Sequence, residues 1–192
     1  MQRAIFMDRD GVLNRVFLHA DGKTHPPKTL EQLEILPGVP EACRSLRRAG
    51  FLLIVVSNQP DVARGTQQRE VVEAINQTLR LQIALDEVRI CFHDNEDKCF
   101  CRKPKPGLLL DAARAWGINT GQSFMIGDRW TDIEAGLRAG CKTVLVNASY
   151  RELARSRPHF QAGSLLEAAG WILDQDRGPI PPLRHAKLPI FT

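Results

Sequence analysis

Short runs of apolar and β-branched residues recur along the chain, separated by stretches with helical periodicity. Continuous apolar runs of this length, bounded by polar residues, are typical of strands that are buried on both faces. Their alternation with helical patterns predicts an α/β fold, a Rossmann-like three-layer sandwich with a central parallel sheet. The runs expected to form strands are 3–7 (RAIFM), 52–57 (LLIVVS), 87–92 (EVRICF), 123–127 (SFMIG) and 142–146 (KTVLV).

Two segments have the apolar stripe expected of helices packed on such a sheet. The first segment, residues 39–49, ends before Gly50, and its stripe consists of Val39, Ala42, Cys43, Leu46 and Ala49. The second segment, residues 131–139, is expected to bury Ile133 and Leu137. Cys141 then comes just before the last predicted strand and, like Cys43, is interpreted as a packing residue.

The rest of the chain divides into one domain and a tail. With 192 residues the chain can bury one substantial core, and residues 1–174 are expected to form a single domain. Residues 14–37 are a long polar connection after the first strand, which we expect to border a site. Residues 175–192 are rich in proline and have no regular period, so they predict an extended tail.

Composition and charge exclude some classes of protein. No apolar run approaches the eighteen or so residues that cross a bilayer, and Asp8 interrupts the N-terminal apolar stretch where a signal peptide would continue. We therefore expect a cytoplasmic protein without membrane contact, with a monomer as the default. The net charge of +4 is spread along the chain without a basic run, which gives no support to a nucleic-acid partner.

Polar side chains follow several of the predicted strands. Asp8 and Asp10 follow the first strand, Ser57 ends the second, and Asp128 and Asp132 follow the fourth. Because ligands bind at the carboxyl ends of parallel strands, these groups are expected to share one crevice. Carboxylates this close repel one another unless a cation lies between them, and Mg²⁺ fits carboxylate, water and phosphate ligands best.

The segments DRDGVLN, SNQ, RKPKPG and GDRWTD, in this order, resemble the four motifs of haloacid dehalogenase-type (HAD-like) phosphatases over residues 4–147. The resemblance implies that Asp8 is a nucleophile that forms an aspartyl phosphate. It also implies that Asp10 protonates the leaving group and then activates water. Residues 1–174 would be one HAD-like phosphatase domain.

The resemblance assigns further roles around these two acids. Mg²⁺ would be held by the Asp8 carboxylate, the Asp10 carbonyl and Asp128, while Asp132 would orient the metal shell or the lysine. The groups implied to bind the phosphate of the substrate are Ser57, Asn58, Gln59 and Lys103.

A second pattern lies just before the lysine motif. Cys91, His93, Cys99 and Cys101 form C-x-H-x5-C-x-C, and in a reducing compartment such a cluster indicates a metal site rather than disulfides. Three thiolates and one imidazole suit tetrahedral Zn²⁺ with no open position, so the site is expected to be structural. The zinc-binding loop would then present Arg102 and Lys103 at fixed positions.

The stretches between the motifs are too short for a large cap domain, so the substrate site is expected to be open. Among capless phosphatases, the zinc loop is similar to those of two families, the heptose 1,7-bisphosphate 7-phosphatases and the histidinol-phosphate phosphatases. SNQPDVARG favours the first family, and the short gap between His93 and Cys99 favours the second. We favour the first family, with heptose 1,7-bisphosphate as the small-molecule substrate and another sugar phosphate or bisphosphate as the alternative, and we expect Arg102 and Arg129 to contact it.

Three other functions stay open at this point. A receiver-like signalling domain shares the acids, the lysine and Mg²⁺, but its phospho-accepting aspartate would follow a middle strand, whereas the third strand here ends in Cys91. A phosphatase acting on nucleic-acid ends would need an extended basic groove. A zinc-dependent binding module would leave the aspartate motifs unexplained.

Overall fold

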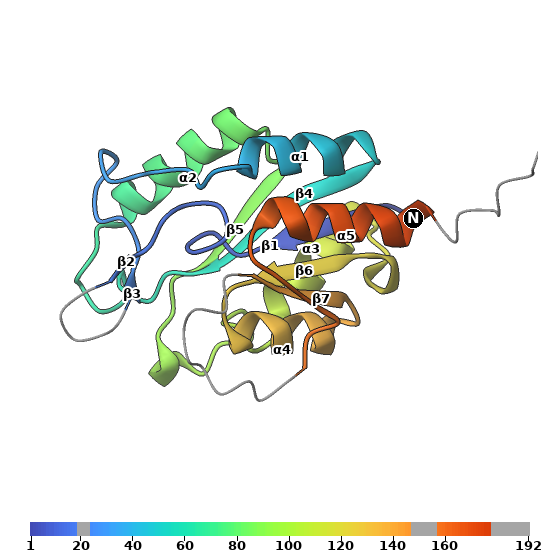
Figure 1. Ribbon diagram of the computed structural model, residues 1–192. Helices are drawn as coiled ribbons and strands as arrows, with labels where there is room; N and C mark the ends of the chain where they lie inside the picture. The colour runs from blue at the N-terminus through green and yellow to red at the C-terminus, as the bar shows by residue number, and fades with distance from the viewer. Residues whose placement is uncertain (19–23, 147–156, 178–192) are drawn as a thin grey trace, which may run out of the picture.

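Six parallel strands form the central sheet of the computed structural model, which describes residues 1–18, 24–146 and 157–177 (Figure 1). The strand order is β5-β4-β1-β6-β7-β8. The five predicted strands are confirmed, and the sequence pattern missed the short edge strand β8. The bounds are β1 Arg3–Met7, β4 Phe51–Asn58, β5 Glu87–Cys91, β6 Phe124–Gly127, β7 Lys142–Val146 and β8 Phe160–Ala162.

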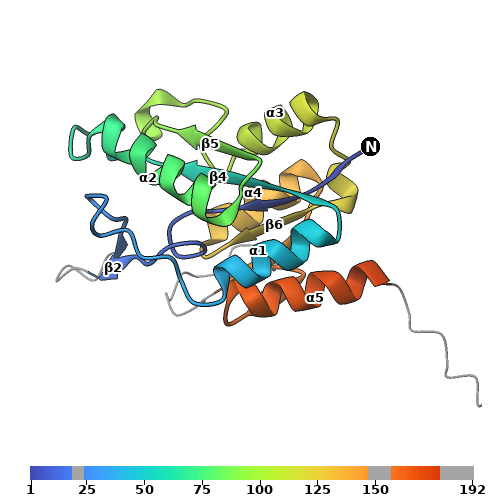
Figure 2. The same cartoon turned by 90° about the horizontal axis from the view of Figure 1, so that it is seen from above.

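Helices cover both faces of this sheet, as the predicted three-layer sandwich requires. Side chains alternate along β1, so that Ile5 and Met7 enter one buried cluster and Ala4 and Phe6 the other. The first cluster includes residues of α1, α2 and α5, and the second those of α3 and α4; Figure 2 shows α1 and α5 side by side. The bounds are α1 Val39–Arg48, α2 Arg69–Ile83, α3 Gly107–Trp116, α4 Trp130–Ala139 and α5 Leu165–Arg177.

The predicted helix packing is correct for α1 and partly wrong for α4. Cys43 and Cys141 are buried, as expected of packing residues. Leu137, however, is 37% exposed, so its predicted burial is wrong. The small residues Ala135 and Gly136 instead face the sheet and allow a close approach, which places Leu137 on the solvent flank of the helix.

No separate cap domain is built by the described residues between the strands. The segment 14–37 contains a two-stranded hairpin, β2 (Phe17–Leu18) and β3 (Thr24–His25). Two short 3-10 helices, η1 (Asn95–Asp97) and η2 (Thr120–Gln122), lie in other connections.

The chain ends of the described part bear on two further expectations. Helix α5 continues to Arg177, so the first residues of the predicted tail are helical. The remainder of the tail, 178–192, lies outside the described residues. No helix in the described ranges combines the length and the apolar character that crossing a bilayer requires.

Candidate active site

Three carboxylates meet at the carboxyl end of the sheet. Asp8 directly follows β1, Asp128 follows the neighbouring strand β6, and Asp132 lies in the first turn of α4. One oxygen from each lies within 4.8 Å of the other two, and all three residues are buried. We call these residues the carboxylate cluster. The structure therefore brings together the acids that the sequence placed after different strands.

Lys103 lies against this cluster and is 3% exposed. Its ammonium lies 2.8 Å from Asp8 Oδ1 and 2.6 Å from Asp132 Oδ1, and it donates a hydrogen bond of 2.7 Å to the Val56 carbonyl. Burial alone would lower the pKa of this lysine, but the charges of Asp132 and Asp8 outweigh burial and raise it. The side chain is thus a permanent cation within a buried group of acids.

Asp128 is the carboxylate without a counter-ion of its own. Neither of its oxygens has a hydrogen-bond partner among the described residues. Burial, together with the charges of Asp8 and Asp132, raises its pKa to about 8. An unpartnered buried carboxylate beside two others is the arrangement that a bound divalent cation would satisfy, and all-oxygen ligands suit Mg²⁺.

Two glycines allow the carboxylates to approach the strand ends. Gly11 has φ +87°, and a Cβ atom added there would lie 2.3 Å from Asp128 Oδ2. A Cβ added at Gly127 would lie 2.1 Å from the Cβ of Asp132. Asp132 in turn accepts a hydrogen bond of 3.0 Å from the Arg129 amide at the start of α4, so its orientation is fixed from both sides.

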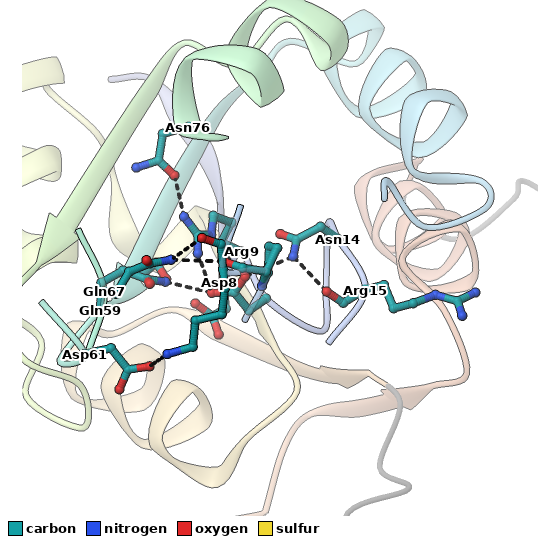
Figure 3. A network of polar contacts seen from close by, with 12 residues as sticks. Asp8, Arg9, Asn14, Arg15, Gln59, Asp61, Gln67 and Asn76 are labelled. Carbon is teal, nitrogen blue, oxygen red and sulfur yellow. Dashed lines mark hydrogen bonds and ion pairs between the residues drawn. The ribbon is translucent and has the colours of Figure 1, made fainter. Parts of the chain in front are cut away.

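Asp10 is held by side chains that the sequence did not single out. Both of its oxygens accept hydrogen bonds from the Arg9 guanidinium, at 3.1 and 2.9 Å, and Asn14 donates another at 2.9 Å. Burial alone would raise the pKa of Asp10, but these contacts and Gln59 hold it below its usual value. Arg9 also donates a hydrogen bond to the Asn76 side chain on α2, as Figure 3 shows. The sequence signal for this contact is Asn76, a polar residue on the apolar stripe of α2, which indicates a buried polar partner.

The residues at the end of β4 connect these groups. Gln59 Nε2 donates to Asp10 Oδ2 at 2.7 Å and to Ser57 Oγ at 3.0 Å. The Asn58 side chain exchanges two hydrogen bonds with the backbone of Lys103, at 3.0 and 3.1 Å. Ser57 is buried beside these groups. The predicted phosphate-binding residues therefore lie together, and Asn58 in addition fixes the lysine loop.

The two predicted substrate arginines lie on segments that surround the carboxylate cluster. Arg129 is exposed and donates to Thr24 Oγ1 at 2.9 Å, so it contacts the hairpin of segment 14–37. That segment also contacts the loop after β4 through an ion pair between Lys28 and Asp61. Arg102 donates to Asn95 Oδ1 and to the His93 carbonyl.

The four predicted zinc ligands form a second cluster. Cys91 ends β5, and Cys99, Cys101 and His93 lie in the loop that follows. The sulfur–sulfur distances are 3.2, 3.4 and 3.7 Å, and His93 Nδ1 lies 3.2 Å from Cys101 Sγ. Ligands about 2.3 Å from a tetrahedral zinc ion lie roughly 3.8 Å apart, so the donor set fits Zn²⁺.

Backbone and side-chain contacts hold the loop of the Cys/His cluster to neighbouring segments. The Gln59 amide donates to the Cys91 carbonyl at 2.8 Å, and Lys105 Nζ donates to the carbonyls of Lys98 and Cys99. Arg64, from the loop after β4, forms a bidentate ion pair with Asp94 at 2.7 Å. The loop therefore has fixed contacts on both sides of Lys103.

Comparisons with known proteins agree with this arrangement. Residues 100–168 match a family model described as HAD-hydrolase-like. A D-glycero-beta-D-manno-heptose-1,7-bisphosphate 7-phosphatase of Haemophilus influenzae is 37% identical over 153 residues, which cover 74% of this chain and 79% of the relative. The enzyme of the same name from Rhodopseudomonas palustris is 36% identical over 149 residues, 71% of this chain and 79% of the relative.

A solved structure shares the fold over most of its length. The D,D-heptose 1,7-bisphosphate phosphatase of B. bronchiseptica, complexed with magnesium and phosphate, superimposes with a TM-score of 0.75 at 27% identity. The superposition covers 91% of this chain and 99% of that chain.

Proposed function

This chain belongs to the haloacid dehalogenase-like phosphatases, and we propose that it removes the 7-phosphate from D-glycero-D-manno-heptose 1,7-bisphosphate through an aspartyl phosphate. The reaction type rests on one observation: the Lys103 cation lies between Asp8 and Asp132, next to the unpartnered carboxylate of Asp128. The substrate rests on the relatives that bear this enzyme's name.

Asp8 is the nucleophile in the first step. One of its carboxylate oxygens forms a bond to phosphorus while the bond from phosphorus to the sugar oxygen breaks. Asp10 gives its proton to that leaving oxygen. Against the effect of burial, Arg9, Asn14 and Gln59 hold the pKa of Asp10 below its usual value, and the negative charge of the bound phosphate dianion would oppose that effect of the three side chains.

Asp10 acts in the opposite direction in the second step. Its carboxylate takes a proton from water, the water oxygen bonds to phosphorus, and the bond between phosphorus and Asp8 breaks. The products are inorganic phosphate, the free Asp8 carboxylate and a protonated Asp10. Lys103 stays charged throughout and stabilises the negative charge on the transferred phosphoryl group.

Asp8, Asp128 and the backbone carbonyl of Asp10 would hold Mg²⁺. When bound, the ion offsets the repulsion between the attacking carboxylate and the phosphate. Asp132, which is paired with Lys103, orients the lysine rather than ligating the ion. The phosphate oxygens are received by Ser57, the Asn58 amide and Lys103, and Gln59 orients Ser57 and Asp10.

Zn²⁺ bound by Cys91, His93, Cys99 and Cys101 would have a structural role, because four protein ligands complete its tetrahedral coordination. Arg102 and Arg129 are proposed to contact the sugar from the segments around the carboxylate cluster. We further propose a monomer that acts in the cytoplasm, where the thiols stay reduced.

The decisive experiment is a Mg²⁺-supplemented phosphate-release screen. It compares heptose 1,7-bisphosphate, histidinol phosphate and a panel of hexose phosphates, with the Asp8→Asn variant as the blank. We expect kcat/KM for the heptose bisphosphate to exceed the others by two orders of magnitude or more. A comparable preference for histidinol phosphate or for a hexose phosphate would refute the substrate and leave the reaction type intact.

A further inference from the structure

Arg9 is a fully buried arginine, at 0% exposure, directly between the two proposed catalytic acids in the sequence. Its Nε and one terminal nitrogen donate to the two oxygens of Asp10 at 3.1 and 2.9 Å. The other terminal nitrogen donates to Asn76 Oδ1 at 2.9 Å. The guanidinium therefore forms a bidentate pair with Asp10, here called the fork, while its third nitrogen is held by Asn76. This arrangement fixes the Asp10 carboxylate in direction as well as distance.

Asn76 is unusual for its place on α2. The residues of this helix that face the core are Val72, Ile75, Leu79 and Ile83, and Asn76 is the polar member of the same stripe, at 8% exposure. Burying an amide is unfavourable unless it is hydrogen-bonded. Its bond to Arg9 offsets that cost and connects the Asp10 carboxylate to a fifteen-residue helix.

The remaining contacts of Asp10 come from two further elements. Asn14 donates to Oδ1 at 2.9 Å from the turn after β1, and Gln59 donates to Oδ2 at 2.7 Å from the end of β4. Each oxygen thus has two donors, of which one belongs to Arg9. Since each nitrogen of the Arg9 guanidinium donates a hydrogen bond within the protein and the side chain is 1% exposed, it does not reach the substrate itself.

We propose that Arg9 is a positioning residue for proton transfer by Asp10 and that Asn76 is its anchor. This inference rests on the proposed function, in which Asp10 protonates the leaving oxygen. Loss of the fork leaves Asp10 with one neutral donor on each oxygen, Asn14 and Gln59, so the carboxyl is less firmly fixed in direction, although Asp8 and Lys103 keep their own contacts. The first step then slows in proportion to how much the leaving group needs a proton.

Two esters separate this role from a merely structural one. The sugar oxygen of heptose 1,7-bisphosphate must be protonated as it leaves, whereas p-nitrophenol leaves from p-nitrophenyl phosphate as a stable anion. The kcat/KM value covers the steps up to departure of the leaving group, so it is insensitive to the later hydrolysis of the aspartyl phosphate. General acid catalysis contributes roughly 100-fold or more to such a step.

The test uses full-length protein with Mg²⁺ and the variants Arg9→Gln and Asn76→Leu, with Asp10→Asn for comparison. For Arg9→Gln we expect kcat/KM to fall roughly 100-fold with the heptose bisphosphate. The loss with the aryl ester should be smaller than this by a factor of roughly ten or more. Asn76→Leu keeps the apolar stripe of α2 and should show the same selective loss at roughly tenfold. Arg9→Lys, which cannot form the fork, should not restore the parent value.

Thermal unfolding of each variant establishes whether the protein is folded. If Arg9→Gln does not fold, the comparison of the two esters is made with Asn76→Leu. Equal losses with both esters, or no loss, in a folded variant would overturn the positioning role. Turnover of both esters by Asp8→Asn would instead overturn the proposed function, and it is recognised without any Arg9 variant.

Discussion

The Lys103 ammonium lies 2.6 Å from Asp132 Oδ1, and both side chains are 1% exposed. A buried cation placed between two carboxylates is stable only while its partners remain, because a charge left alone in the interior is strongly unfavourable. The pair therefore fixes the position of the ammonium beside Asp8.

Lys103→Met should abolish Mg²⁺-dependent turnover and lower the free energy of unfolding by about 3 kcal/mol, since it leaves buried carboxylates unpaired. The same change in an Asp132→Asn background should cost at least about 1 kcal/mol less, because one of those carboxylates is already neutral. Urea denaturation of the four proteins measures the coupling. Strictly additive effects would show that the two side chains do not act as a pair.

Asp8→Asn should eliminate phosphate release while the protein stays folded. The amide is close in shape to the carboxylate but cannot attack phosphorus. The exposed pair of Asp111 with Arg114 on α3 offers a matched control, because Asp111→Asn makes the same chemical change outside the carboxylate cluster. Turnover of Asp8→Asn at the level of the Asp111→Asn control would remove Asp8 as the nucleophile.

Protein purified without chelator should contain about one equivalent of zinc. The Cys99→Ser protein should not retain zinc, and it should have a lower melting temperature and a higher KM. The reason is that the loop that holds Arg102 and Lys103 would lose the metal ion that orders it. Cys141→Ala, at a buried cysteine outside the cluster, should keep the zinc even if it is less stable. Elemental analysis of the purified proteins decides the matter: a parent protein free of zinc would contradict the structural role.

Asp128→Asn should flatten the dependence of stability on pH in the absence of Mg²⁺. Burial and the charges of Asp8 and Asp132 raise the folded-state pKa of Asp128 from 3.8 to about 8. The contribution of this group is therefore fully present below the unfolded-state pKa and is lost as the pH rises through about 8. Asp132, whose pKa burial raises to about 6, adds a smaller effect of the same sign in both proteins.

Urea denaturation between pH 4 and 8, in magnesium-free buffer without chelator so that zinc is retained, measures this difference. Mg²⁺ should restore stability to the parent protein most strongly at the upper end of the range and leave Asp128→Asn unchanged. If the free energy of unfolding of the parent protein depended on pH as little as that of the variant, ionisation of Asp128 would not destabilise the folded protein.

The sequence predicted the carboxylate cluster well because the fold leaves little freedom there. Asp8 and Asp128 follow apolar runs that are typical of central strands, and parallel strands bring their carboxyl ends to one edge. Leu137 shows the opposite case. Helical periodicity alone could not show that the small residues of α4, rather than its leucine, face the sheet.

Arg9 could not be assigned from the sequence for a different reason. A charged residue at the end of a strand is usually solvated, and nothing nearby in the chain indicates that this one is buried. Its anchor, Asn76, lies 67 positions away on α2. Only the packing of that helix on the sheet brings the two side chains together.

The strands β1, β4 and β6, at whose ends Asp8, Ser57 and Asp128 lie, adjoin one another inside the sheet, whereas Arg102, Arg129 and the hairpin lie in connections outside it. Backbone amides of the three strands should accordingly exchange hydrogen with solvent only on global unfolding, and those of the hairpin much sooner. If Arg102 and Arg129 contact the sugar as proposed, replacing them would change which phosphate ester is accepted while the three strands, and the ends that hold Asp8 and Ser57, stay in place.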